Sequence, residues 1–278
     1  MAFPCRRIRL IAESYNVPRP VALYGASIAV LATVMAFTGW HSITAVLGAV
    51  LVMIAGLMFF QVRGAVRDLH LDTQRLSKSA CDAEKHYVEV LWRMLRFVEA
   101  SDKYTKGHSE RVSALCEELG RQMSLTSAVC RDLGLAGRLH DLGMIAIPEK
   151  ILAQQSRIGA ADFRTIKRHP EIAYEVLEPL KLLSGALPAI RYHHERMNGT
   201  GYPVGLCGEE IPIEARLLAV ADAYDAMTHD RPHQPAMTPL AAIQELQRCS
   251  PAGYDPRCVE ALGKVKKLKQ LTEVFSPV

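Results

Sequence analysis

The sequence lacks the cysteine pattern of a disulfide scaffold or a zinc ribbon. Its seven cysteines are an odd number, stand far apart and include no Cys-x-x-Cys pair, so they are interpreted as reduced thiols. A strong excess of one charge is also missing, because 33 Lys and Arg face 29 Asp and Glu for a net charge of +4. No chain-wide basic surface for nucleic acid is therefore expected. With 49% hydrophobic and 22% charged residues, disorder is excluded as well.

Two apolar runs without a charged side chain, residues 21–40 and 43–62, lie near the start of the chain. A helix of about 20 residues reaches roughly 30 Å, the thickness of the hydrocarbon core of a bilayer. Only His41 and Ser42 separate the runs, so we predict a tight transmembrane hairpin that turns at these residues. A signal peptide has a shorter run without a second one behind it, and no later segment offers an apolar face to a buried core hairpin. The sequence therefore favours a membrane anchor.

Arginines flank both apolar runs. They are Arg6, Arg7, Arg9 and Arg19 before the first run and Arg63 and Arg67 after the second. Positively charged flanks stay preferentially in the cytoplasm. The pattern predicts a multi-pass protein of the inner membrane, with both ends of the hairpin and the rest of the chain in the cytoplasm.

Residues 63–100 form a predicted helical connector with a spacing of seven. The repeating positions are Leu69, Leu76, Ala83, Val90 and Phe97, with Thr73, Ala80, Tyr87 and Met94 four places after the first four. This heptad-like seam predicts a coiled coil and a parallel homodimer. An amphipathic helix that lies on its own domain is an equal alternative, because alanine and threonine weaken the seam.

Beyond residue 100, amphipathic helical segments without strand-like alternation predict an all-α domain at 101–262, followed by a lysine-rich tail at 263–278. One histidine alone is more often structural than metal-binding. Here, however, five histidines and two aspartates share helical or helix-end contexts, and their joint pattern is informative. They are His108, His140, His169, His193, His194, Asp141 and Asp222.

Five motifs carry this pattern: GHSERV (107–112), LHDLGMIAIPEKIL (139–152), IKRHPEIAYEVL (166–177), HHERMNGTGYP (193–203) and EARLLAVADAYDAMTHDRP (214–232). In this order they resemble the HD-GYP subgroup of the HD phosphohydrolase superfamily, over about residues 95–260 and including GYDP at 253–256. The resemblance implies an HD-type helical metallophosphohydrolase domain that hydrolyses the bacterial second messenger cyclic di-GMP to the linear dinucleotide or GMP. It also implies two or three metal ions, usually iron or manganese.

A phosphodiester is an anion that repels nucleophiles, and paired metal ions about 3.5 to 4 Å apart neutralise it and supply hydroxide at neutral pH. Mixed imidazole and carboxylate ligands suit iron and manganese better than the thiolate sets of structural zinc. By resemblance, the predicted ligands are His108, His140, Asp141 and Asp222 for one ion and Asp141, His169, His193 and His194 for the other, with His140 and Asp141 as the catalytic pair.

The histidine pair precedes a turn-rich loop that contains Gly199, Gly201, Tyr202 and Pro203. This loop is interpreted either as a tight connection between helices or as a recognition surface. The resemblance implies that it contributes to the metal site and docks diguanylate cyclase (GGDEF) proteins. Glu195 is predicted to orient a ligand histidine, with a surface salt bridge as the alternative.

The chain departs from the family pattern at several positions. Met144 stands where the family has the lysine of HD-x-G-K, and Gln234 stands where a second cation is common, while Arg231 remains as the predicted substrate-binding residue. Asn198 replaces a common aspartate of the loop. Tyr104 occupies the position where members with a third metal have glutamate, so two ions are predicted. Each missing charge-assisted contact weakens phosphate binding by roughly 1.5 to 3 kcal/mol.

The sequence thus predicts a membrane-anchored, metal-dependent phosphodiesterase of cyclic di-GMP, with membrane lipid as a further partner. Two alternatives stay open: a metal-containing cyclic-dinucleotide binding or signalling module with degenerate activity, and an HD hydrolase of another nucleotide. The departures at Met144 and Gln234 favour slow or weak-binding catalysis over none, because the predicted metal ligands are all present.

Overall fold

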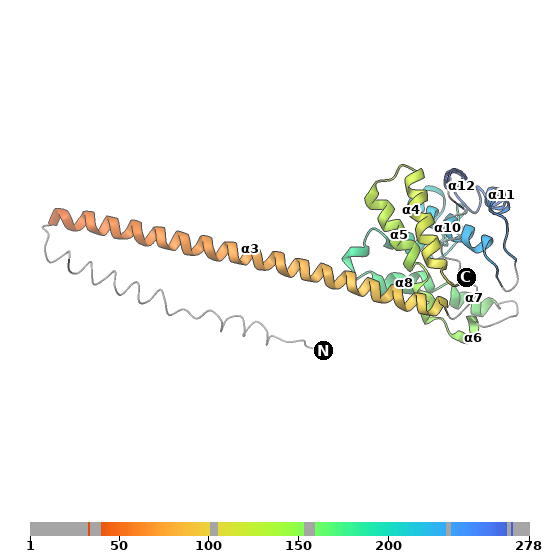
Figure 1. Cartoon of the computed structure of the whole chain (residues 1–278), viewed down its shortest axis with the longest axis horizontal. Helices are drawn as coiled ribbons and strands as arrows, with labels where there is room; N and C mark the ends of the chain where they lie inside the picture. Colours follow the sequence, from red (N-terminus) through yellow and green to blue (C-terminus); the bar gives the residue numbers. More distant parts are fainter. Residues whose placement is uncertain are drawn as a thin grey trace. The chain divides into compact units, whose positions relative to one another are not determined.

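The structure, a computed structural model, describes residue 33 and residues 40–100, 105–152, 159–231, 235–265 and 268. Within these ranges the secondary structure is helical, and the predicted all-α class is confirmed. The helices are α3 (Trp40–Ala100), α4 (His108–Gln122), α5 (Ser127–Leu139), η1 (Leu142–Ala146), α6 (Glu149–Leu152), α7 (Ala160–Ile166), α8 (His169–Leu177), η2 (Lys181–Leu183), α9 (Leu187–Tyr192), η3 (Gly208–Glu210), α10 (Ile213–Thr228), α11 (Pro239–Cys249) and α12 (Pro256–Gly263) (Figure 1).

The described contacts divide the chain into two units, residues 1–77 and 78–278. In the first unit, the predicted second span at 43–62 lies wholly within α3. Its side chains face outward, and Val52 and Phe60 are each 74% exposed. Among the described residues, α3 alone is long and apolar enough to cross a membrane, and its candidate span begins at Ile43.

The predicted hairpin is described only in part. Apart from Thr33 and Trp40, the first predicted span at 21–40 lies outside the described residues. His41 and Ser42 belong to the first turn of α3, so the prediction that they form the connecting turn is wrong. No helix-start signal in the sequence separates Trp40 from these two residues. The structure therefore describes one apolar helix, and the hairpin stays a prediction.

α3 continues without a break through the predicted connector, because residues 65–100 contain neither glycine nor proline. In the second unit, Val88 and Leu95 of this helix join the hydrophobic core at 8% and 2% exposure. Within this unit, the predicted seam faces away from that core, and Tyr87 and Met94 are 61% and 51% exposed. The helix thus packs on its own domain through one face and presents the seam on another.

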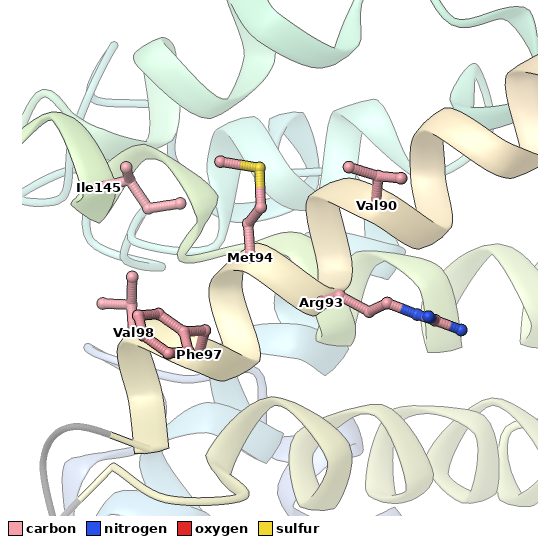
Figure 2. A pocket seen from close by; sticks show the side chains of 6 residues that line it. All are labelled: Val90, Arg93, Met94, Phe97, Val98 and Ile145. Carbon is pink, nitrogen blue, oxygen red and sulfur yellow. The ribbon is translucent and has the colours of Figure 1, made fainter.

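An apolar groove of about 350 Å³ accompanies the end of the seam (Figure 2). Five of its residues come from α3 and the sixth from η1, the short helix that follows Asp141. The lining residues are Val90, Arg93, Met94, Phe97, Val98 and Ile145.

The core of the second unit surrounds α10, which packs against α4, α5, α9, α11 and α12. Leu217, Leu218 and Tyr224 of α10 are completely buried. α4 and α5 approach closely at Gly137, where a Cβ atom would lie 2.7 Å from the Cα atom of Ser113. This approach sets the start of α4 and the end of α5 side by side, which matters because predicted ligands lie at both places.

Capping residues fix several helix starts. Thr126 accepts a hydrogen bond from the backbone N–H of Val129 at the start of α5, and Thr238 accepts one from that of Ala241 at the start of α11.

Near the C-terminal end of the chain, Lys264 pairs with Glu260 at 2.7 Å on the surface. Lys266, Lys267 and Lys269, which complete the predicted basic tail, lie outside the described residues.

Candidate metal centre

The seven predicted metal ligands converge from the ends of helices, with one exception. His108 and His169 are the first residues of α4 and α8, whereas His140 follows α5 directly. Helices that end near one point can each contribute a side chain there, and whole helical turns need not be packed around the site. The remaining predicted ligands are Asp141 before η1, His193 and His194 after α9, and Asp222, which lies within α10.

Asp141 is the centre of this arrangement. One of its carboxylate oxygens, Oδ2, lies 3.2 Å from Nε2 of His140. The other, Oδ1, lies 3.4 Å from Nε2 of His169. Asp222 approaches from the opposite helix, with Oδ1 3.5 Å from Nε2 of His108. Asp141 thus connects two groups of ligands, as a bridging carboxylate does.

Three sets of donor atoms in the described residues are close enough to hold a metal ion, with all atoms of a set within 4.8 Å of one another. Together the sets contain the seven predicted ligands and no other residue. The sets are His108, His140 and Asp222; His169, His193 and His194; and His140, Asp141 and His193.

Hydrogen bonds fix which nitrogen each imidazole presents. Nδ1 of His140 lies 3.0 Å from the carbonyl oxygen of Gly137, and Nδ1 of His193 lies 2.7 Å from that of Ile190. His169 makes the same contact with a carbonyl three residues earlier. A carbonyl only accepts, so each Nδ1 carries a proton and donates it, and Nε2 is the ring nitrogen that faces the cluster.

The residues present fit divalent metal ions. Nε2 of His169 and Nε2 of His193 are buried and have no hydrogen-bond partner among the described residues. Such an atom is costly to bury unless a ligand satisfies it. Burial lowers the pKa of His194 to about 4, which keeps that imidazole neutral and able to donate a lone pair. Neutral imidazoles combined with carboxylates suit iron or manganese.

Asp225 completes the surroundings of His108, although sequence reasoning missed it. Its Oδ2 lies 2.8 Å from Nδ1 of His108, and Arg111 binds both carboxylate oxygens at 2.7 and 2.9 Å. Burial opposes the charge, but the contacts with His108 and Arg111 hold the pKa of Asp225 well below its usual range. A signal was present, since Asp225 follows Asp222 by three residues and three-residue spacing places two side chains on one helix face.

The loop after the histidine pair is held by Glu195. Its buried carboxylate accepts hydrogen bonds from the backbone N–H groups of Val204 and Gly205 at 2.8 and 2.9 Å. Glu195 thus holds the loop in place. The sequence predicts that it orients a ligand histidine, but its observed hydrogen bonds go to the loop instead. Gly201 leaves no room for a side chain, because a Cβ atom there would overlap the backbone of Glu195 and of Arg196.

The loop packs against the candidate metal site. Gly199 adopts a φ of 74°, a left-handed conformation that favours glycine. The ring of Tyr202 lies against that of His194, with centroids 4.8 Å apart and a tilt of 31°. Tyr202 and Pro203 are both half-buried. The loop is therefore part of the wall of the site.

The residues at which the chain departs from the family pattern, and the retained Arg231, are described next to the ligand cluster only in part. Met144 is half-buried in η1. Arg231, the predicted substrate-binding residue, is exposed and makes no ion pair among the described residues. Gln234 and Tyr104 lie outside the described residues. The structure therefore brings the seven ligands together and leaves Arg231 outside their cluster of contacts.

Two further contacts fix the ligands' backbones. A Cβ atom at Gly143 would overlap the carbonyl oxygen of His169, so η1 and α8 can approach this closely only without a side chain at position 143. On the other side, the buried carboxylate of Glu99 in α3 accepts hydrogen bonds from the backbone N–H of Ser109, at 3.2 Å, and from its hydroxyl. Ser109 directly follows His108, so α3 holds the first turn of α4.

With this geometry established, the chain's relatives define its class. The family described as HD domain matches residues 94–258, so the chain belongs to this family. A solved structure described as a HDG"Y"P protein from Bdellovibrio bacteriovorus has a TM-score of 0.51 at 19% identity and covers 67% of this chain and 64% of that one. It shows the helical HD fold, and the predicted HD-type domain is confirmed.

Curated relatives are more similar in sequence. The cyclic di-GMP phosphodiesterase response regulator RpfG of Xanthomonas campestris is 40% identical over 73% of this chain and 54% of its own length. A cyclic di-GMP phosphodiesterase of Pseudomonas aeruginosa is 38% identical over 60% and 40%. The 3'3'-cGAMP-specific phosphodiesterase 3 of Vibrio cholerae is 33% identical over 62% and 38%. This chain thus spans about half or less of the length of these relatives.

Proposed function

We propose that this chain is a metal-dependent phosphodiesterase that hydrolyses cyclic di-GMP to the linear dinucleotide or GMP. The observation that carries the proposal is the convergence of the seven ligands on Asp141, with the buried Nε2 atoms of His169 and His193 left for a ligand. The names of the relatives support the substrate class, since they are phosphodiesterases of cyclic di-GMP and of 3'3'-cGAMP.

Two divalent ions, iron or manganese rather than zinc, fit the donor set. Bound ions of this kind supply a nucleophile at neutral pH and neutralise the charge that develops on a phosphate. The residues that would hold them are His108, His140, Asp141 and Asp222 for one ion and Asp141, His169, His193 and His194 for the other.

The chain's own residues prepare the site. The backbone carbonyls of Gly137, Ile166 and Ile190 fix the imidazoles of His140, His169 and His193 in one tautomer. Asp225 orients His108. Because these groups are held before any ligand arrives, little reorganisation is needed when charge develops, which is the condition for electrostatic catalysis.

Met144 supports an alternative, a cyclic-dinucleotide binding or signalling module with degenerate activity. A thioether in place of an ammonium removes one charge-assisted contact, which is worth roughly 1.5 to 3 kcal/mol. The ligand cluster does not depend on this side chain, so we favour a slow or weak-binding enzyme over an inactive one. Hydrolysis of another nucleotide is favoured by one observation, the relatives specific for 3'3'-cGAMP.

The decisive experiment uses the full chain in detergent, loaded with manganese or ferrous iron. Cyclic di-GMP and 3'3'-cGAMP are supplied separately, and the products are resolved by chromatography. We expect linear dinucleotide or GMP from cyclic di-GMP. In Asp141→Ala, loss of the bridging carboxylate should abolish hydrolysis and lower the metal content together. Full metal loading of that variant would overturn the ligand assignment, and binding without turnover in the parent would support the signalling module.

We further propose that the protein is anchored in the inner membrane as a multi-pass protein, with the HD domain in the cytoplasm. The exposed apolar segment of α3 supports contact with membrane lipid. A parallel homodimer through the exposed seam, and docking of GGDEF proteins on the 199–203 loop, remain predictions. The one-face packing of α3 on its domain leaves the seam available for the first of these.

A further inference from the structure

We propose that Lys167 binds the second phosphodiester of a cyclic dinucleotide, the one that is not being cleaved. The inference rests on the proposed function, and it gives the site a means to prefer substrates with two phosphates over those with one. It concerns a residue that the sequence motifs did not single out.

The backbone places Lys167 next to the ligand cluster. Lys167 directly follows α7 and comes two residues before His169. Its N–H donates to the carbonyl oxygen of Phe163 at 3.0 Å, and the side chain is half-buried. The backbone segment that positions His169 therefore also positions Lys167.

The ammonium group lies over two aromatic rings. Nζ is 5.1 Å from the centroid of Tyr202 and 5.0 Å from that of Phe163. Tyr202 in turn packs against His194. Lys167, Tyr202 and His194 thus form a row that starts at the ligand cluster and ends at a positive charge, one aromatic ring away from a predicted ligand.

This charge has no carboxylate to neutralise it among the described residues, since no ion pair joins Lys167 to an acidic side chain there. Arg191 differs in this respect, because it pairs with Glu171 at 3.5 Å. Ring faces attract an ammonium only modestly, by about 0.5 to 2 kcal/mol. The ammonium group of Lys167 can therefore still bind an anion.

The chemistry of the substrate supplies that anion. A cyclic dinucleotide carries two phosphodiesters on one ring, and only one of them can occupy the ligand cluster at a time. The other must lie to one side of it. An ammonium that is displaced from the cluster by one aromatic ring is suited to this remote phosphate, whereas a cation beside Asp141 would contact the phosphate that reacts. Met144 places no charge beside Asp141.

The test compares Lys167→Met, which keeps the apolar stem, with Lys167→Arg, which keeps the charge. Lys181→Met is the matched control, because Lys181 is exposed in η2. All proteins are the full chain. The measurements are kcat and KM for cyclic di-GMP, the Kd of cyclic di-GMP for the chelator-treated protein by calorimetry, metal content and Tm. Bis(p-nitrophenyl) phosphate serves as a substrate with a single phosphodiester.

Loss of one charge-assisted contact should raise KM and Kd for cyclic di-GMP by about 10- to 100-fold in Lys167→Met. Its kcat, metal content and rate on bis(p-nitrophenyl) phosphate should stay near those of the parent, and Lys167→Arg should recover most of the affinity. Unchanged KM and Kd in a variant with parental Tm would overturn the proposal.

An equal loss on both substrates, or a loss of metal, would also overturn the proposal, because it would make Lys167 a support of the cluster. Failure of the proposed function has a different signature: the parent and the Lys181→Met control would then not hydrolyse cyclic di-GMP, whether or not they bind it.

Discussion

Asp225 and His108 are 117 residues apart in the sequence and are joined by a buried hydrogen bond of 2.8 Å between Oδ2 and Nδ1. Arg111 holds the same carboxylate from its other side. Two residues from two helices, Asp225 and Arg111, thereby fix one imidazole. A ligand histidine with a charged acceptor on its second nitrogen is a better electron donor and is held in one orientation.

Asp225→Asn should therefore weaken metal binding. The amide keeps the shape but removes the negative charge that orients His108, and we expect about a 10- to 100-fold loss of metal affinity. Competition with a calibrated chelator measures it. Asp82→Asn is the control, since Asp82 is an exposed residue of α3 that pairs only with Lys85 among the described ion pairs. Equal metal affinity in parent and Asp225→Asn would show that His108 is oriented without this carboxylate.

Gly143→Ala should destabilise the domain and disturb the site. Its Cβ atom would overlap the carbonyl oxygen of His169, so η1 and α8 must separate, at a cost of about 1 to 3 kcal/mol. Thermal unfolding and metal content are the measurements. The control is Gly263→Ala, where the new Cβ atom has nothing within 4 Å. If both variants unfold at the same temperature, the close approach of η1 and α8 is not maintained in solution.

The pair of Arg216 and Asp255 predicts a pH-dependent stability. Nη1 of Arg216 lies 2.8 Å from Oδ2 of Asp255, and both side chains are buried. Burial opposes the charge of Asp255, but hydrogen bonds from Arg257 and Arg216 lower its pKa below the ordinary value of 3.8. A depressed pKa stabilises the folded state at pH values above the unfolded pKa, and this contribution disappears as the pH falls through the folded pKa.

Asp255→Asn should therefore cost most near neutral pH, by about 3 to 5 kcal/mol, because Arg216 loses its buried partner and keeps, among the described ion pairs, only the exposed Glu209, at 3.1 Å. The difference in unfolding free energy between parent and variant should shrink as the pH falls below about 4. Denaturation at several pH values measures it. Glu260→Gln, which changes an exposed pair with Lys264, should have little effect at any pH. A cost that does not vary with pH would contradict the assignment.

The apolar segment of α3 should determine membrane binding. Lysines in place of Leu51 and Val52, which are 65% and 74% exposed, should each cost about 2.5 to 3.5 kcal/mol in the hydrocarbon core. We expect the double variant to move from the membrane fraction to the soluble fraction after carbonate extraction. Leu76→Lys, at 70% exposure and beyond the apolar run, should leave the distribution unchanged. Soluble parent protein would refute the anchor.

The sequence was sufficient for the helical class and for gathering the seven predicted ligands, because those residues lie in motifs with recognisable neighbours. It indicated Asp225 only through the three-residue spacing from Asp222, and it did not indicate Lys167. Their roles depend on contacts with His108 and Tyr202, which come from other parts of the chain, and long-range contacts leave no local periodicity. Glu195 was assigned to a histidine, whereas its carboxylate accepts N–H groups from the loop that follows. The position of Glu195 next to His194 in the sequence did not determine which groups its carboxylate contacts.

The contact between Glu99 and Ser109 gives the end of α3 a mechanical role. A displacement or rotation of Glu99 reaches the first turn of α4 through the two hydrogen bonds to Ser109. His108 is the neighbour of Ser109, so the load acts one residue away from a predicted ligand. Strain on α3 would thus change the geometry of the predicted ligands, and the affinity for metal would depend on the force on that helix.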